Sequence, residues 1–99
     1  GGEGRSGKGV NHEGDPEARG RLEAALEIAR ENKDLRTQGI IYSDFATMAA
    51  ENGEVGLLKK HWAESKRLLE MRRETELLAG QREELALTCR KAGLDWQPD

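Results

Sequence analysis

The segment Gly39–Arg72 constrains the fold most, because it contains two amphipathic helical patterns separated by a single turn signal. Asn52-Gly53 marks the turn, since glycine readily adopts the left-handed conformation that ends a helix. Apolar or small residues recur at helical spacing before the turn (Ile41, Phe45, Met48, Ala49) and after it (Leu58, Trp62, Ser65, Leu69). Each set falls on one face of a 3.6-residue helix. The segment is therefore expected to form an antiparallel helical hairpin, with helices over residues 37–52 and 55–73.

A further helix is expected before this hairpin, over residues 16–33. Asp15-Pro16-Glu17 marks its start, because Asp can cap free backbone N–H groups and Pro suits the first helical position. Its buried stripe comprises Leu22, Ala25, Leu26 and Ala29. Three members of this stripe match Leu58, Trp62 and Ser65 at an offset of 36. The match indicates either an internal repeat or a chance similarity between two amphipathic helices.

The last helix is expected over residues 75–92. The stripe that ends at Leu69 restarts in another phase at Leu78 and continues to Cys89. This change favours a break near Thr75 over one long bent helix, and a polar residue on the stripe, Gln81, suits a capping helix with a wet outer side. The sequence therefore predicts an all-α domain of four antiparallel helices.

The residues that follow this helix are mostly polar, apart from two large apolar side chains. Leu94 and Trp96 are expected to fold back over the end of the helix, although Trp96 could instead belong to a motif read by a partner. Residues 97–99 are expected to trail off.

The hairpin residues resemble a tetratricopeptide repeat, a 34-residue helical pattern. With Gly39 as first position, the matching residues are Tyr42, Phe45, Ala46, Gly53, Glu54, Trp62 and Ser65. The pattern is broken at Ala49, Leu58 and Glu70, and the match covers about a third of the chain, residues 39–72. The resemblance implies a fragment of a right-handed superhelical scaffold that binds peptides or partner helices.

The resemblance also implies which residues would face a ligand. The first helix of such a repeat lines the concave groove, which places Ile40, Ser43, Thr47 and Ala50 toward a ligand and Glu51 at the rim. We expect these residues to bind the partner, and Ile40, Ser43 and Thr47 to be partly exposed. The asparagine and lysine positions that clamp C-terminal carboxylates in some repeats are not matched, so that ligand is not predicted.

Residues 1–14 contain six glycines and one aliphatic residue, so they are expected to form a disordered leader before the helical domain of residues 15–99. Gly2 and Gly7-Lys8 copy most of a phosphate-binding loop, but Gly9 stands where Ser or Thr should hold magnesium. Nucleotide binding is therefore not expected. No apolar run approaches a membrane span, and the single Cys89 fits a reducing compartment, so a cytoplasmic or nuclear location is expected.

No constellation of catalytic residues is found. Ser43 has no His at a spacing that could activate it, and His61 is flanked by lysines that would not orient an imidazolium. Trp62 and Cys89 lie on apolar stripes and are expected in the core. The sequence predicts a non-enzymatic protein-interaction module, with no catalytic residue, no cofactor and no metal site.

Two other functions remain open. The third helix carries six basic residues against two acidic ones, which could bind nucleic acid; the basic residues are Lys59, Lys60, Lys66, Arg67, Arg72 and Arg73. No aromatic stacking pattern accompanies them, so nucleic acid is the weaker expectation. Alternatively, because only 35% of the residues are apolar and 35% are charged, the thin core could be completed by a second copy in a homodimeric scaffold.

Overall fold

The computed structural model describes residues 16–99, and all regular secondary structure in that range is helical. The helices are α1 (Pro16–Glu31), α2 (Leu35–Glu51), α3 (Val55–Met71) and α4 (Thr75–Lys91). The all-α prediction is confirmed, and every predicted boundary lies within two residues of the observed one. The predicted leader 1–14 and the Asp15 cap lie outside the described residues.

Three of the helices begin at a constant interval along the sequence: α2 at Leu35, α3 at Val55 and α4 at Thr75. Each turn contains one left-handed residue, and these residues recur at the same interval: Lys33, Gly53, Arg73 and Gly93, with φ between 56° and 76°. The next amide N–H then bonds the carbonyl five residues back, at N···O distances of 2.8–3.0 Å. This Schellman closure repeats in every turn and makes the helices antiparallel.

The observed interval corrects the predicted internal repeat. At this interval the pair α1 and α2 corresponds to the pair α3 and α4. Leu22 of α1 then corresponds to Trp62 of α3, and Ala29 corresponds to Leu69. The predicted match of Leu22 with Leu58 is one helical turn short. A stripe spaced i, i+4, i+7 partly matches itself after such a shift, which explains the error.

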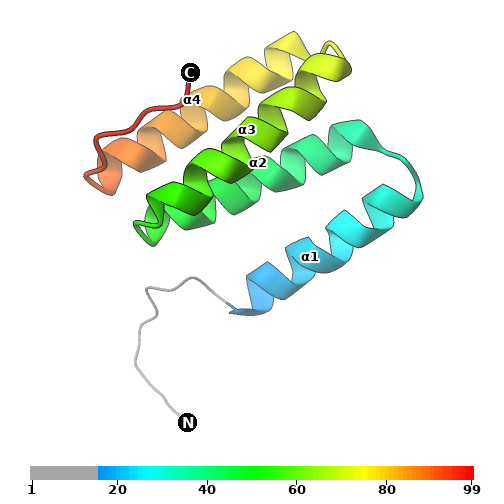
Figure 1. Cartoon of the computed structure of the whole chain (residues 1–99), viewed down its shortest axis with the longest axis horizontal. Helices are drawn as coiled ribbons and strands as arrows, with labels where there is room; N and C mark the ends of the chain where they lie inside the picture. The colour runs from blue at the N-terminus through cyan, green and yellow to red at the C-terminus, as the bar shows by residue number, and fades with distance from the viewer. Residues whose placement is uncertain (1–15) are drawn as a thin grey trace, which may run out of the picture.

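Helix α2 is the centre of the arrangement, and the other three helices pack around it (Figure 1). Helix α1 contacts α2 alone, whereas α4 contacts both α2 and α3. Because α2 has neighbours on several sides, its buried residues are distributed around the helix: Gln38, Gly39, Ile41, Ser43, Ala46, Ala49 and Ala50. The stripe of α1 is mostly half-buried, because only one helix covers it.

The core lies where α2, α3 and α4 meet. Its largest fully buried side chains include Trp62, Leu58, Leu69, Leu85 and Cys89. Burial of Trp62 and Cys89 is confirmed. The turn Arg72–Glu74 separates α3 from α4, so the predicted break is also confirmed.

The end of the chain is more ordered than the sequence indicated. Leu94 and Trp96 pack against the core cluster, as expected. Pro98 is buried, and the Asp99 carboxylate lies 2.9 Å from the Lys66 ammonium group. The prediction that residues 97–99 trail off is therefore wrong, because these residues pack back onto the helices.

Candidate functional site

The structure divides the predicted groove residues into buried and accessible ones. Ser43 is 1% exposed and Ala50 is fully buried, so the expectation that Ser43 is partly exposed is wrong, and Ala50 does not face solvent either. Helix α4 packs against α2, and the Ser43 hydroxyl donates to Gln81 Oε1 of α4 at 2.6 Å. Ile40 and Thr47 are half-buried, and Glu51 is exposed.

Thr47 lies in an open trough between α1 and α2, with a volume of about 540 Å³. We call this the α1–α2 trough; it is lined by Ala18, Arg21, Leu22, Ala25, Asp44, Thr47 and Met48. The Thr47 hydroxyl donates to the Ser43 carbonyl at 3.1 Å within its own helix. Its polar atom therefore already has a partner, so the trough does not require a polar ligand at this point.

Two charged side chains of opposite sign belong to the α1–α2 trough. Arg21 makes an exposed i, i+4 ion pair with Glu17 at 4.0 Å. Asp44 is exposed, yet its pKa is raised above the ordinary value. Partial desolvation of the carboxylate is the larger cause, and the nearby Glu84 carboxylate is the second. The remaining lining is apolar or small, except for Thr47, so the trough offers no concentrated charge to an anionic or cationic ligand.

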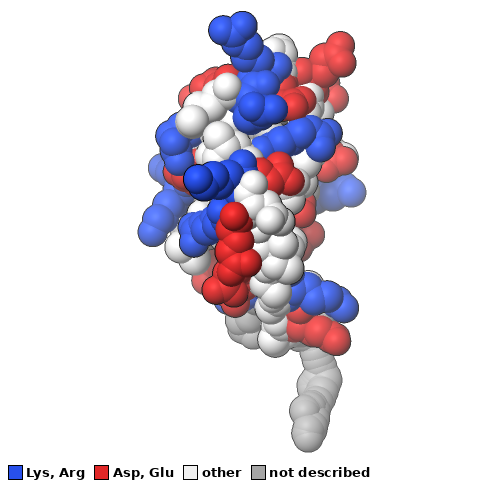
Figure 2. Space-filling model, turned by 90° about the vertical axis from the view of Figure 1, so that its right-hand side faces the viewer, with Lys and Arg blue, Asp and Glu red and all other residues white. Residues whose placement is uncertain are grey.

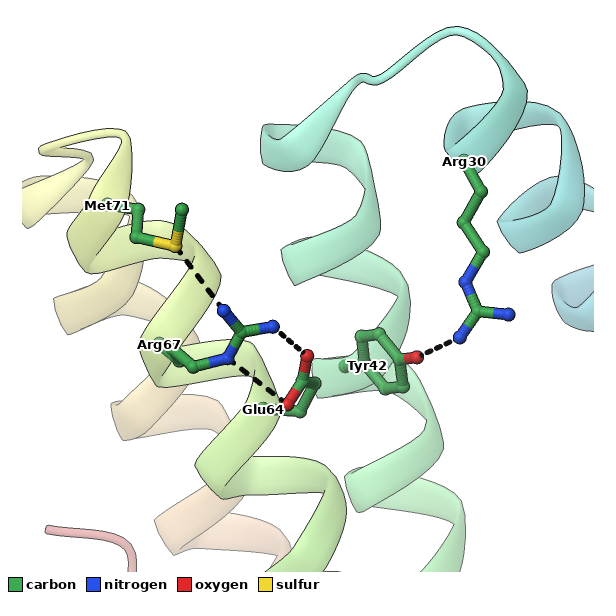
Figure 3. Close-up of polar contacts among 5 residues, drawn as sticks. All are labelled: Arg30, Tyr42, Glu64, Arg67 and Met71. Carbon is green, nitrogen blue, oxygen red and sulfur yellow. Dashed lines mark hydrogen bonds and ion pairs between the residues drawn. The ribbon is translucent and has the colours of Figure 1, made fainter.

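A second hollow lies on the other side of α2, between α1 and α3, with a volume of about 260 Å³. Three rings line this α1–α3 crevice: His61 lies 6.2 Å from Tyr42 and 5.4 Å from Phe45 between ring centroids. Arg30 of α1 donates to the Tyr42 hydroxyl at 2.6 Å, as Figure 3 shows. This bond ties α1 to α2 at the edge of the crevice.

His61 has a lowered pKa, first because of burial and then because of Lys60 and Arg19. Its ring is packed with Tyr42 and Phe45 rather than directed at a nucleophile. Burial likewise raises the pKa of the Cys89 thiol, which favours an unreactive side chain. Within residues 16–99, no group of three or more His, Cys, Asp or Glu side chains is placed to hold a metal ion.

The basic residues of α3 do not form a uniform cationic strip. Arg67 pairs with Glu64 one turn earlier on the same helix and contacts Met71 (Figure 3), and Lys66 pairs with Asp99. Figure 2 shows Lys and Arg side chains interspersed with Asp and Glu on one end of the molecule. The basic side chains of α3 therefore attract an anionic ligand less strongly than the number of lysines and arginines suggests.

Two contacts between distant residues could not be predicted from the sequence. The Arg30–Tyr42 bond spans two helices whose relative placement no local pattern encodes. The contact of Asp99 with Lys66 joins residues 33 apart. The only sequence signal for the second contact is the pair of large apolar residues, Leu94 and Trp96, beyond the end of α4.

No helix in residues 16–99 combines the length and apolar character that crossing a lipid bilayer requires. Comparison with protein-family models, with curated proteins and with solved structures finds no match for this chain.

Proposed function

We propose that this chain is a non-enzymatic protein-interaction module that binds a peptide or partner helix in the α1–α2 trough. The observation that carries this proposal is the trough itself: an open hollow of about 540 Å³ beside a helix that contacts only one neighbour. Ala18 and Ala25 leave room for a backbone to approach, and Leu22 and Met48 supply apolar contact area. An amphipathic helix that lays its apolar face into a groove matches these features.

The proposal includes a tetratricopeptide-like scaffold. The close approach of Gly39 and Ser65, joined by a 2.7 Å hydrogen bond from the Ser65 hydroxyl to the Gly39 carbonyl, supports a repeat of this kind. The helix pair recurs at a longer interval than in that pattern, and the 17-residue helices account for much of the added length. We further propose a protein or peptide partner, because the trough lacks the charge that nucleic acid would require. We also propose a cytoplasmic location, which the single cysteine, Cys89, supports.

A pull-down from native lysate tests the proposal. The wild type, a Thr47→Arg variant and a Lys59→Glu/Lys60→Glu control are compared, because the two lysines are exposed and lie away from the trough. The proposal expects a protein that the wild type and the control retain and that Thr47→Arg loses. The reverse ranking, with capture of nucleic acid that falls steeply with salt, would favour the basic surface of α3.

Sedimentation over a range of concentrations distinguishes the proposed module from the homodimeric scaffold. A module that acts through the trough is expected to sediment as a monomer with or without the Thr47→Arg substitution. A wild-type dimer that Thr47→Arg dissociates would instead assign the trough to a second copy of the chain.

A further inference from the structure

A separate surface of the molecule already holds an extended segment, namely its own residues 94–99. After Gly93 the backbone reverses and runs back along α4 as residues 94–99 (Figure 1). The Leu94 amide still bonds the Cys89 carbonyl at 3.0 Å, and beyond this bond the segment is neither helix nor strand. Its position is therefore determined mainly by side-chain contacts.

These contacts have a defined chemistry. Trp96 packs against the core cluster of α2, α3 and α4, and Pro98 is buried two residues later. The Asp99 carboxylate accepts a hydrogen bond from Lys66 of α3 at 2.9 Å, and this bond lowers the pKa of Asp99. The segment thus presents a large apolar anchor, a proline and a carboxylate to the helices.

The helices present a matching surface, which we call the α3–α4 groove; it includes Trp62, Lys66 and Cys89. The Lys66 side chain is only 25% exposed, so its ammonium group is partly desolvated beside an anion. The indole N–H of Trp62 is buried and has no hydrogen bond of normal geometry. It nevertheless lies close enough to the Asp99 carboxylate to help lower the pKa of Asp99. A cation and a buried N–H donor therefore stand together beside the carboxylate of the segment.

We propose that the α3–α4 groove is a peptide-binding site whose present occupant is residues 94–99. It would accept from a partner protein an extended segment with the same chemistry: a tryptophan, then a proline, then an acidic side chain. The groove shares no residue with the α1–α2 trough, so this inference does not depend on the proposed function.

The attached segment would also regulate the groove. Gly93 connects it to α4 with a φ of 76°, and release of residues 95–99 would leave the bond from the Leu94 amide to the Cys89 carbonyl in place. An intramolecular ligand on a short linker has an effective concentration on the order of millimolar. A partner segment must therefore compete with residues 94–99, and weakening the attached segment should expose the site.

The test measures binding of a fluorescein-labelled, C-terminally amidated hexapeptide, Leu-Asp-Trp-Gln-Pro-Asp, to the full chain by anisotropy. The amide removes the terminal carboxylate, so the aspartate side chain supplies the anion at its end. Wild type is compared with Asp99→Lys, a change at a side chain that is 84% exposed and is not expected to unfold the chain. The variant is expected to bind the peptide at least tenfold more tightly than the wild type.

A charge exchange provides the matched control. Lys66→Glu in a chain that keeps Asp99 also weakens the attached segment, because two carboxylates then face each other. This variant should fail to bind the aspartate peptide and should bind a peptide that ends in lysine. A merely structural role for Lys66 would not produce this reversal. A second variant, Trp96→Ala, should release the groove by removing the apolar anchor.

Three outcomes would overturn the proposal. The first is that Asp99→Lys and Trp96→Ala both retain wild-type helicity in circular dichroism and still fail to bind the peptide. Binding could be equal for the wild type and the variants, which would place the peptide elsewhere. Finally, a wild-type dimer in sedimentation that Trp96→Ala dissociates, without peptide binding, would assign the groove to exchange of residues 94–99 between two copies.

Discussion

Gly39 of α2 lies so close to Leu69 of α3 that a β-carbon at position 39 would be 2.8 Å from Leu69 Cγ. Leu69 is fully buried and has little freedom to move away. The same approach allows the Ser65 hydroxyl to donate to the Gly39 carbonyl at 2.7 Å. The glycine is therefore required by packing between two helices, although it lies inside a helix where alanine is usually preferred.

Gly39→Ala should destabilise the protein, because overpacking a filled core costs roughly 1–3 kcal/mol. Gly56 and Gly80 are also helical, and a β-carbon at either position would meet nothing within 4 Å. Alanine at those two sites should stabilise the fold by about 0.5–1 kcal/mol through helix propensity. Urea denaturation of the three variants checks the contrast, and a stabilising Gly39→Ala would show that α2 and α3 are farther apart.

The repeated turns predict opposite effects at equivalent positions. Gly53 and Arg73 occupy the same left-handed position in consecutive turns, with φ of 75° and 56°. Gly53→Ala should cost about 1 kcal/mol, because a β-carbon is strained in this conformation. Arg73→Gly should stabilise the fold by up to about 1 kcal/mol by removing that strain. Thermal melting measures both, and equal effects of the same sign would contradict the shared turn geometry.

Trp62→Ala should remove the largest side chain of the core, which is 1% exposed. The cost is expected at roughly 3–5 kcal/mol, a large share of the stability of a small domain. Leu87→Ala serves as the control, because that leucine is 46% exposed and should cost far less. Circular dichroism during urea titration compares the two, and similar midpoints would place Trp62 on the surface.

His61 predicts a loss of stability in mild acid. Its pKa is lowered in the folded protein, mainly by burial, so the unfolded chain binds a proton more readily than the folded one. The stability contribution is fully present above the ordinary histidine pKa of about 6.5 and is lost as the pH falls toward the lower folded pKa. Urea midpoints at descending pH should decrease more for the wild type than for His61→Gln, and parallel profiles would contradict the burial of this ring.

Much of the fold could be predicted from the sequence because helical periodicity is a local property. Stripe spacing alone predicts that Trp62 and Cys89 lie in the core, and the Asn52-Gly53 signal locates the central turn. The constant interval between helices was not found, since only two of the four left-handed turn positions are glycine: Gly53 and Gly93. The chemistry of a turn residue indicates a helix end, but Arg73 gives no such signal.

The candidate site was harder to predict, because periodicity does not indicate which helix lies at the centre. A small residue such as Ser43 fits an open groove and a close helix contact equally well. The contact between α2 and α4 decides between them, and it joins Ser43 to Gln81 across 38 residues of sequence. Thr47, one turn further along α2, escapes this coverage and stays accessible in the trough.

This difference between neighbouring turns of α2 gives the last prediction. Ser43→Arg would place an unpaired charge in a fully packed position and leave Gln81 without its hydrogen-bond donor, at a cost of about 3 kcal/mol or more. Thr47→Arg should change the free energy of unfolding by only ~0.5 kcal/mol, because its side chain can extend from the open trough into solvent. Guanidinium denaturation of both variants measures the difference. If Ser43→Arg unfolded at the same denaturant concentration as Thr47→Arg, α4 would not cover α2 in solution, and Ser43 would rejoin Thr47 on a ligand-facing surface.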